Sequence, residues 1–271
     1  MAMFKIDDLD ETRAPLLDHL IELRTRVIRA LLALGVGFCV CLYFADEILG
    51  LLVWPLKQAF PNGEGQLIFT KLPEVFFVEL KVALFAGFMV SFPVIANQLW
   101  AFVAPGLYAR EKKAFLPFLF ATPILFGAGA ALAYFVVMPI AFNFFLGFGG
   151  EAGGMKLEAL PSAGEYLTLV MQFILAFGLT FLLPVLLLLL HRAGIITRAQ
   201  MAAARRYVIV AIFVIAAVVT PPDPGSQIIL ALPLWLLFEG ALLLMRFQEK
   251  AVEADKAARE AEEAAERAAA E

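Results

Sequence analysis

The residues of this sequence most able to do chemistry are two carboxylates beside apolar segments. Glu22 lies in the segment 19–26 (His-Leu-Ile-Glu-Leu-Arg-Thr-Arg), and Glu111 follows Arg110 and precedes two lysines. A carboxylate in apolar surroundings is costly unless it has a purpose, and its natural chemistry is ion pairing with a cation. Each residue also has an ordinary interpretation. Glu22 is spaced to pair with Arg26 on one helix face, and Glu111 is a solvated loop charge.

Residues for catalysis or metal binding are not apparent. The sequence has no Gly-x-Ser-x-Gly elbow, no phosphate-binding loop and no His-Glu-x-x-His motif. Its two histidines, His19 and His191, lie at the boundaries of apolar runs. Cys39 and Cys41 are two positions apart, so on a helix they point to different sides. We therefore expect no enzyme, no metal site and no cofactor.

The elements that must position these residues are transmembrane helices. The chain is 62% hydrophobic and 17% charged, whereas soluble domains are about 45–50% apolar and about 25% charged. A backbone in lipid must satisfy its own hydrogen bonds, and apolar runs without alternation exclude a β-barrel. We expect an all-α membrane protein whose six spans cover about residues 27–44, 75–100, 114–135, 166–190, 207–220 and 228–245. For the third span, a continuation to residue 148 is an open alternative.

Lysine and arginine positions predict the orientation of the spans, since these residues accumulate in cytoplasmic loops. Most of the 21 lysines and arginines lie before the first span, between the second and third, between the fourth and fifth, and after the sixth. The opposite side holds only Lys57, Lys71, Lys81 and Lys156. This asymmetry predicts that both termini lie in the cytoplasm.

Prolines interrupt nearly every predicted span. Each removes a backbone donor and tends to kink its helix, although membrane helices tolerate proline well. Together they favour bent helices that enclose a concave surface. The prolines are Pro93, Pro117, Pro123, Pro139, Pro184 and Pro233.

The segments outside the spans differ in character. Residues 46–60 are apolar with a tryptophan and predict a short interfacial helix on the outer face, and residues 149–164 predict a glycine-rich outer loop. After the transmembrane domain of residues 1–248, residues 249–271 are rich in Ala, Glu, Lys and Arg and lack an apolar stripe, which predicts a mobile or partly helical cytoplasmic tail. The net charge of −4 belongs to this tail, so it indicates no nucleic-acid partner.

Several short motifs resemble the TatC family of the twin-arginine protein translocase, in the family's order. Residues 19–24 match its amino-terminal signature, and residues 100–108, followed by Glu111, match its first cytoplasmic loop. Residues 133–137 and 176–178 match in the third and fourth spans, and residues 220–223 and 226–227 match the last outer loop. Each motif alone is weak, but together they cover residues 19–247.

This resemblance implies a function in protein export. TatC-like proteins form the receptor core of a translocase that exports folded precursors, driven by the proton-motive force and without nucleotide hydrolysis by this subunit. The implied location is the bacterial cytoplasmic membrane, and the implied fold is a curved, glove-like bundle. The implied partners are the single-helix subunits TatA and TatB, membrane lipid, further copies of the subunit, and signal peptides that carry two adjacent arginines.

The resemblance also implies which residues form the signal-peptide site. Family carboxylates that correspond to Glu22 and Glu111 bind the arginine pair. The surrounding patch contains Phe102, Leu107, Arg24 and Arg26. The matching outer loop gives further functional candidates, Pro221, Pro222, Asp223 and Gln227.

One position of the chain departs from the family pattern. Many relatives carry a polar or acidic residue two positions before the proline that matches Pro184, where this chain has Leu182.

Two other functions compete with the one that the resemblance implies. A secondary transporter or channel for a small solute predicts internal repeats, which are not visible in the sequence. An intramembrane enzyme needs a nucleophile–base pair or metal ligands within its spans.

Overall fold

The computed structural model describes residues 8–60, 65–107, 112–152, 155–157, 160–192, 194–219 and 224–270. Most of these residues are helical. The helices are α1 (Asp8–Tyr43), α2 (Ala45–Ala59), α3 (Glu74–Leu107), α4 (Lys112–Leu132), the π-helical turn η2 (Ala133–Val137), α5 (Met138–Leu146), α6 (Ala163–Thr180), α7 (Leu183–Arg192), α8 (Arg198–Ala203), α9 (Arg205–Val219) and α10 (Pro224–Ala270). The segment predicted as a glycine-rich loop contains two short antiparallel strands, β1 (Gly150–Ala152) and β2 (Met155–Leu157).

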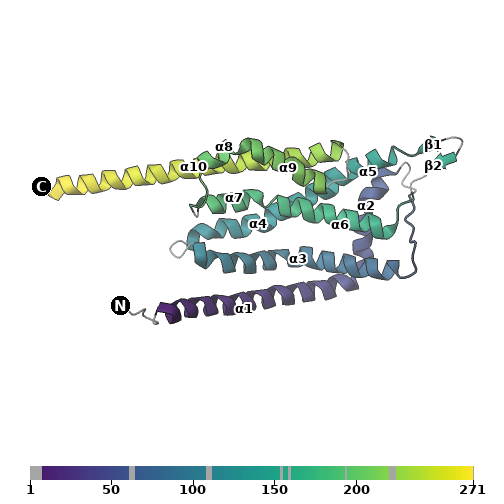
Figure 1. Ribbon diagram of the computed structural model, residues 1–271, viewed down its shortest axis with the longest axis horizontal. Coiled ribbons are helices and arrows are strands. Elements are labelled where there is room, and N and C mark those ends of the chain that lie inside the picture. The colour runs from purple at the N-terminus through teal and green to yellow at the C-terminus, as the bar shows by residue number, and fades with distance from the viewer. Residues whose placement is uncertain are drawn as a thin grey trace, which may run out of the picture.

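The long helices run along one axis, and both termini lie at the same end of the bundle (Figure 1). We call this the terminal end, and we call the opposite end, where β1 and β2 pair, the hairpin end. α1 packs along α3, α4 along α6, and α10 along α7 and α9. α2 crosses the bundle at the hairpin end and contacts α3 and α5.

Five helical segments within the described residues are long and apolar enough to cross a membrane. They are His19–Tyr43, Glu74–Phe102, Phe118–Leu146, Ala163–Arg192 and Gln227–Phe247. Each overlaps a predicted span, and the third continues well beyond residue 135 because η2 joins α4 to α5. The remaining predicted span, 207–220, coincides with α9, whose 15 residues measure about 22 Å. That length is short of the roughly 30 Å of a hydrocarbon core.

The outer surface of the bundle is apolar. Val36 on α1 is 66% exposed and Val90 on α3 is 69% exposed, and similar side chains follow the length of both helices. An apolar surface this extensive is unfavourable in water but matches hydrocarbon. The described helices are therefore those of an integral membrane protein.

A close glycine contact attaches α1 to α3. A Cβ atom on Gly87 would lie 2.6 Å from the backbone nitrogen of Phe38, and one on Gly37 would lie 2.8 Å from the carbonyl oxygen of Gly87. Small residues let membrane helices approach to this distance. The Ser91 hydroxyl also donates a hydrogen bond to the carbonyl oxygen of Ala33 at 2.8 Å. These contacts fix where the terminal end of α1 lies against α3.

The interior contains two apolar clusters. The one nearer the hairpin end joins α2, α3, η2, α5 and α6 around fully buried side chains such as Phe173. In the one nearer the terminal end, the rings of Phe92 and Phe126 stack with centroids 3.7 Å apart. There the indole nitrogen of Trp100 donates a hydrogen bond to the Thr122 hydroxyl at 2.7 Å. The two clusters hold α3, α4 and α6 together along most of their length.

Helix irregularities coincide with two of the six prolines considered above. α6 gives way to α7 beside Pro184, and the π-helical turn η2 comes directly before Pro139. A proline at the start of a helix loses little, because the first backbone donors have no intrahelical acceptor. The other four lie inside uninterrupted helices: Pro93, Pro117, Pro123 and Pro233.

The hairpin end is held together by tyrosines. α2 occupies the segment where a short interfacial helix is predicted. Tyr134 donates a hydrogen bond to the carbonyl oxygen of Leu51 at 2.6 Å, and Tyr166 donates one to that of Leu52 at 2.8 Å. These bonds position α2 across the ends of η2 and α6. At the opposite end, residues 249–270, predicted to form a partly helical tail, continue α10 to Ala270.

Candidate functional site

The terminal ends of α1 and α3 bring several of the predicted site residues together. The ring of His19 stacks on that of Phe102, with centroids 4.3 Å apart and 18° between the planes. The glycine contact between the two helices, farther along the bundle, sets this alignment. One helical turn after His19, the side chain of Glu22 lies on the same part of α1. An aromatic surface and a carboxylate therefore lie close together.

Glu22 is engaged by a neighbouring arginine. Arg26 Nη2 donates a hydrogen bond to Glu22 Oε1 at 3.0 Å, and Arg26 Nη1 lies 3.5 Å from Gln98 Oε1 on α3. The ordinary interpretation of Glu22, a partner for Arg26 four residues later, is thus present in the structure. The pair is accessible, with 26% of the Arg26 side chain and 33% of the Glu22 side chain exposed. Within the described residues, Glu22 Oε2 has no hydrogen-bond partner.

The other predicted residues of this site are placed less completely. Arg24 is exposed on α1. α3 ends at Leu107, whose side chain lies outside the described residues, as does the whole of Glu111. α4 begins at Lys112, so the connection between α3 and α4 returns at the terminal end. The structure therefore brings Glu22, Arg26 and Phe102 together and leaves the contribution of Glu111 a prediction.

Two contact residues were missed by the sequence analysis. Gln98, which holds Arg26, is a polar residue inside an apolar span, and that signal was available. His19 was placed at the boundary of an apolar run and in the motif of residues 19–24, but no contact was predicted for it, although it precedes Glu22 by three positions and shares its helix face. Its stacking on Phe102 depends on how two helices pack, so no local pattern predicts it.

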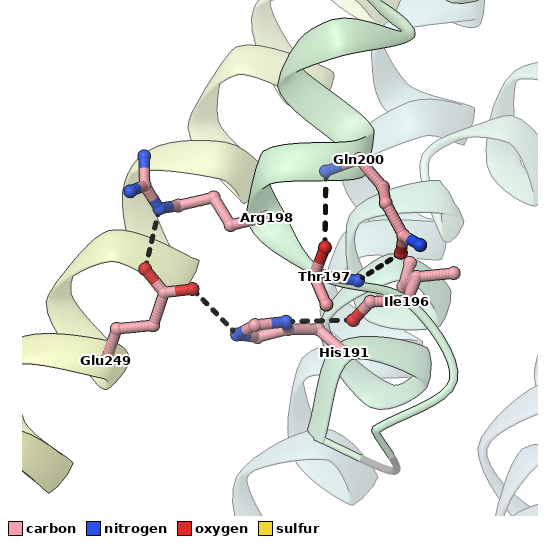
Figure 2. A network of polar contacts seen from close by, with 6 residues as sticks. All are labelled: His191, Ile196, Thr197, Arg198, Gln200 and Glu249. Carbon is pink, nitrogen blue, oxygen red and sulfur yellow. Dashed lines mark hydrogen bonds and ion pairs between the residues drawn. The ribbon is translucent and has the colours of Figure 1, made fainter.

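A second polar network at the terminal end joins the α7–α8 connection to α10 (Figure 2). Arg198 Nε donates a hydrogen bond to Glu249 Oε2 at 2.6 Å, and His191 Nε2 lies 3.8 Å from Glu249 Oε1. His191 Nδ1 is 3.1 Å from the carbonyl oxygen of Ile196. Nearby, Arg205 Nη2 pairs with Glu239 Oε2 at 2.9 Å and ties α9 to α10.

In the connection between α7 and α8, one helix ends and the next begins within a few residues. Gly194 adopts a φ of 72°, which a glycine accommodates readily at a helix C-terminus. Thr197 and Gln200 then form a capping box: Gln200 N donates to the Thr197 hydroxyl, and Thr197 N donates to Gln200 Oε1. Both devices hold His191 and Arg198 in place around Glu249 (Figure 2).

Of the outer-loop candidates, the structure describes one. The side chain of Gln227 donates a hydrogen bond from Nε2 to the carbonyl oxygen of Phe213 at 3.1 Å, which ties the start of α10 to α9. Pro221, Pro222 and Asp223 lie outside the described residues. The contact gives Gln227 a structural role and leaves a functional role for this loop a prediction.

A third polar cluster, which the sequence analysis did not single out, lies at the hairpin end. Glu74 Oε2 accepts hydrogen bonds from the backbone nitrogens of Thr70 and Lys71, at 2.7 and 3.2 Å, and from the Thr70 hydroxyl at 3.1 Å. Glu74 Oε1 accepts from the Ser162 hydroxyl at 2.6 Å and from Gly164 N at 3.0 Å. An ionised carboxylate is the acceptor-only group that such a set of donors requires. Glu74 thereby joins the starts of α3 and α6.

Metal and thiol chemistry find no support in the part of the chain that the structure describes. There, no group of three or more His, Cys, Asp or Glu side chains is placed to hold a metal ion. Cys39 is exposed and Cys41 is buried, and neither forms a disulfide. The described clusters are built from ion pairs, hydrogen bonds and aromatic contacts, which suit binding.

A family comparison identifies the class of protein. The family model described as Sec-independent protein translocase protein (TatC) matches residues 18–233. The chain belongs to the TatC family. The match includes both helices that carry Glu22 and Phe102 and all of α4 to α9. TatC is a translocase component and not an enzyme, and membership of this family does not favour the solute-transporter alternative.

Relatives cover almost the whole chain. The TatC protein of Magnetococcus marinus is 46% identical over 255 residues, which are 94% of this chain and 92% of that protein. The TatC protein of Escherichia coli is 36% identical over 237 residues, which are 88% and 90% of the two chains. A crystal structure of the twin arginine translocase receptor TatC in DDM has a TM-score of 0.73 and 39% identity, and covers 84% of this chain and 99% of that one.

Leu182, the position expected to depart from the family pattern, lies where α6 and α7 meet. Leu182 stands between α6 and α7 and packs, partly buried, against the apolar cluster nearer the terminal end. Its backbone nitrogen donates a hydrogen bond to the carbonyl oxygen of Leu179 at 3.1 Å. A polar side chain at this position would border that cluster.

Proposed function

We propose that this chain is the receptor subunit of a twin-arginine protein translocase and that its terminal end binds the signal peptide. The observation that carries the proposal is the convergence of α1 and α3, which places the accessible Glu22 carboxylate beside the stacked rings of His19 and Phe102. The related crystal structure of a receptor TatC supports the same function. Partly shielded carboxylates suit a peptide that carries two guanidinium groups.

The Glu22–Arg26 pair suggests how a peptide arginine is accommodated. Arginine presents a planar fork that binds carboxylates bidentately, whereas lysine is a point charge. Arg26 uses one oxygen of Glu22 and has Gln98 as a second partner. A peptide arginine therefore binds the remaining oxygen, or replaces Arg26, which stays held by Gln98. Glu111 supplies the second carboxylate, and Phe102 and Leu107 supply apolar contact.

The proposed topology has six crossings with both termini in the cytoplasm. Two termini at one end of the bundle require an even number of crossings, and this supports α9 as a sixth crossing beside the five longer ones. The distribution of lysine and arginine supports a cytoplasmic terminal end. Signal peptides are made in the cytoplasm, so a receptor site at this end faces its ligand.

The translocase around this subunit follows from the same proposal. We expect the single-helix subunits TatA and TatB as partners, several copies of the subunit in one complex, and transport driven by the proton-motive force in the bacterial cytoplasmic membrane. We also expect that the helices enclose a concave, glove-like surface.

Crosslinking of a twin-arginine signal peptide tests the site. Membranes would carry the wild type, Glu22→Ala, Glu111→Ala or the double variant. A charge-assisted hydrogen bond contributes about 1.5–3 kcal/mol, so each single variant should bind roughly tenfold or more weakly. Glu47→Ala is the matched control, because Glu47 is an exposed acid on α2 at the hairpin end. A twin-lysine peptide should crosslink poorly even to the wild type. Full crosslinking to a normally inserted double variant would refute the site.

A further inference from the structure

A groove runs between α3 and α6 from the hairpin end towards the middle of the bundle. It consists of two adjoining hollows of about 790 and 450 Å³, which share the side chains of Lys81, Thr168 and Gln172. The hollow at the hairpin end is lined by polar groups that include Lys71, Glu74 and Glu165. The deeper hollow is almost entirely apolar, and its walls are Leu34, Leu84, Phe85, Phe88, Met171 and Leu175. The deeper hollow is therefore less polar than the hollow at the hairpin end.

Three charged groups in this groove have no partner among the residues that the structure describes: the ammonium groups of Lys71, at the rim, and Lys81, and the carboxylate of Glu165. Lys81 is exposed seven residues into α3, and its ammonium forms no hydrogen bond or ion pair there. Glu165 is exposed in the first turn of α6, and its carboxylate likewise forms none. Glu74, by contrast, is saturated by its five donors. A charged lysine within a membrane span is costly in free energy, so an anionic partner would stabilise Lys81.

The charges are arranged in order of depth. Glu165 lies next to Gly164, whose nitrogen bonds Glu74, so it is level with the start of α3. Lys81 lies about 10 Å farther along α3, and its flexible stem can carry the ammonium back towards the hairpin end. Phe77 and Val78 already contribute apolar wall before Lys81, and beyond Lys81 the walls are almost entirely apolar. From the hairpin end inwards, the groove thus offers the Glu165 carboxylate and the Lys71 ammonium at its rim, then the Lys81 ammonium, then an apolar channel.

We propose that this groove binds one phospholipid of the phosphatidylethanolamine type, from the leaflet at the hairpin end. Such a lipid presents a primary ammonium outermost, a phosphate below it and acyl chains below both, which is the complementary order. Glu165 accepts hydrogen bonds from the lipid ammonium, Lys81 binds the phosphate, and an acyl chain lies against Leu84, Phe88 and Met171.

The headgroup chemistry distinguishes this lipid from others. A choline headgroup has no N–H donor for Glu165, although its phosphate could still bind Lys81. An anionic glycerol headgroup brings no cation to Glu165 and leaves that carboxylate beside a second negative charge. The combination of a free carboxylate and a free ammonium therefore favours the zwitterionic lipid with a primary amine over both.

Native mass spectrometry of the purified protein tests the proposal. Phosphatidylethanolamine, phosphatidylcholine and phosphatidylglycerol with identical acyl chains would be offered at equal mole fractions. We expect the ethanolamine lipid to be retained best by the wild type, and Lys81→Gln to lower its retention about tenfold. Glu165→Gln should reduce its advantage over the choline lipid, because the amide loses the charge but keeps one acceptor oxygen. Lys57→Gln and Glu47→Gln change exposed charges on α2 outside the groove and should retain the wild-type preference.

A photocrosslinker gives an independent readout of position. Placed at Gln172, which both hollows share, it should capture lipid in native membranes, and Lys81→Gln should lower that capture. Capture by the same group at Val90, which faces the bulk lipid, should not change in Lys81→Gln. Equal retention of all three lipids would overturn the proposal, as would a preference for the glycerol lipid that Glu165→Gln does not change. A crosslink from Gln172 to a polypeptide in place of lipid would also overturn it, because a partner helix would then fill the groove.

Discussion

Arg198 donates a hydrogen bond from Nε to Glu249 Oε2 at 2.6 Å, and this bond joins the short helix α8 to α10 (Figure 2) near the point where α10 extends beyond the bundle (Figure 1). His191 Nε2 lies 3.8 Å from the other carboxylate oxygen, Glu249 Oε1, and the two groups form an ion pair when the imidazole is protonated. One carboxylate thereby holds the α7–α8 connection and the base of the tail together.

Replacing Glu249 should loosen this junction and leave the rest of the fold intact. The Arg198 and Glu249 side chains are partly exposed, so the pair contributes only about 0–1 kcal/mol. In Glu249→Gln we expect unchanged thermal stability but faster hydrogen exchange at residues 194–200 and greater mobility of a spin label on the tail. Lys250→Gln removes the neighbouring exposed charge and should change neither signal. Identical exchange in the two variants would contradict a clamping role.

The contact between α1 and α3 should be sensitive to one added methyl group. Gly87→Ala places a Cβ against the backbone of Phe38, and overpacking of this kind costs about 1–3 kcal/mol. We expect a lower melting temperature in detergent and a slower disulfide between cysteines introduced at His19 and Phe102. Gly35→Ala is the control, because no atom lies within 4 Å of its added Cβ. A normal disulfide rate in Gly87→Ala would show that this glycine does not align the terminal ends.

Removal of the Glu74 carboxylate should release the hairpin end. Glu74→Ala deprives Thr70, Lys71, Ser162 and Gly164 of their shared acceptor. We expect faster amide exchange at residues 70, 71 and 164, and an intermediate effect in Glu74→Gln, whose amide keeps one acceptor oxygen. Glu79→Ala, in the same helix, is the control. Exchange that stays slow in Glu74→Ala would mean that other contacts hold the two helix starts.

The shortness of α9 should be visible as a change in membrane thickness. Its 15 residues span about 22 Å, and the carbonyl oxygen of Phe213, near its middle, accepts a hydrogen bond from Gln227 in the first turn of α10. If α9 crosses the membrane, lipid must thin there or the connection must lie below the general headgroup level. A spin label at Gln227 should therefore report a position at or below the lipid phosphates. A label well above the phosphates, in a bilayer of uniform thickness, would rule this out.

Much of the fold could be predicted because lipid imposes simple rules. Runs of apolar residues fixed the existence of the long helices, and the amphipathic segment that became α2 was recognisable from its composition. The ends were less predictable. The third span continues through η2 to Leu146, which agrees with the longer of the two lengths that the sequence left open, but the π-helical turn within it has no local signature strong enough to recognise.

The candidate site was predictable only in part. The spacing of Glu22 and Arg26 predicts their ion pair, since helical residues four apart are neighbours. The stacking of His19 on Phe102 and the contact of Arg26 with Gln98 depend on the glycine contact that aligns two helices. Glu74 has partners on two segments separated by about ninety residues, and only the folded chain brings them together.

The unbroken course of α10 turns a small rotation into a large displacement. From Phe247, where its apolar part ends, to Ala270 the helix extends for about 34 Å. A tilt of about 10° at the Glu249 junction therefore moves Ala270 sideways by about 6 Å. A force applied at the far end of this helix therefore acts on the α7–α8 connection over a long lever arm. Conversely, a small shift of that connection produces a larger displacement of Ala270, far from the membrane.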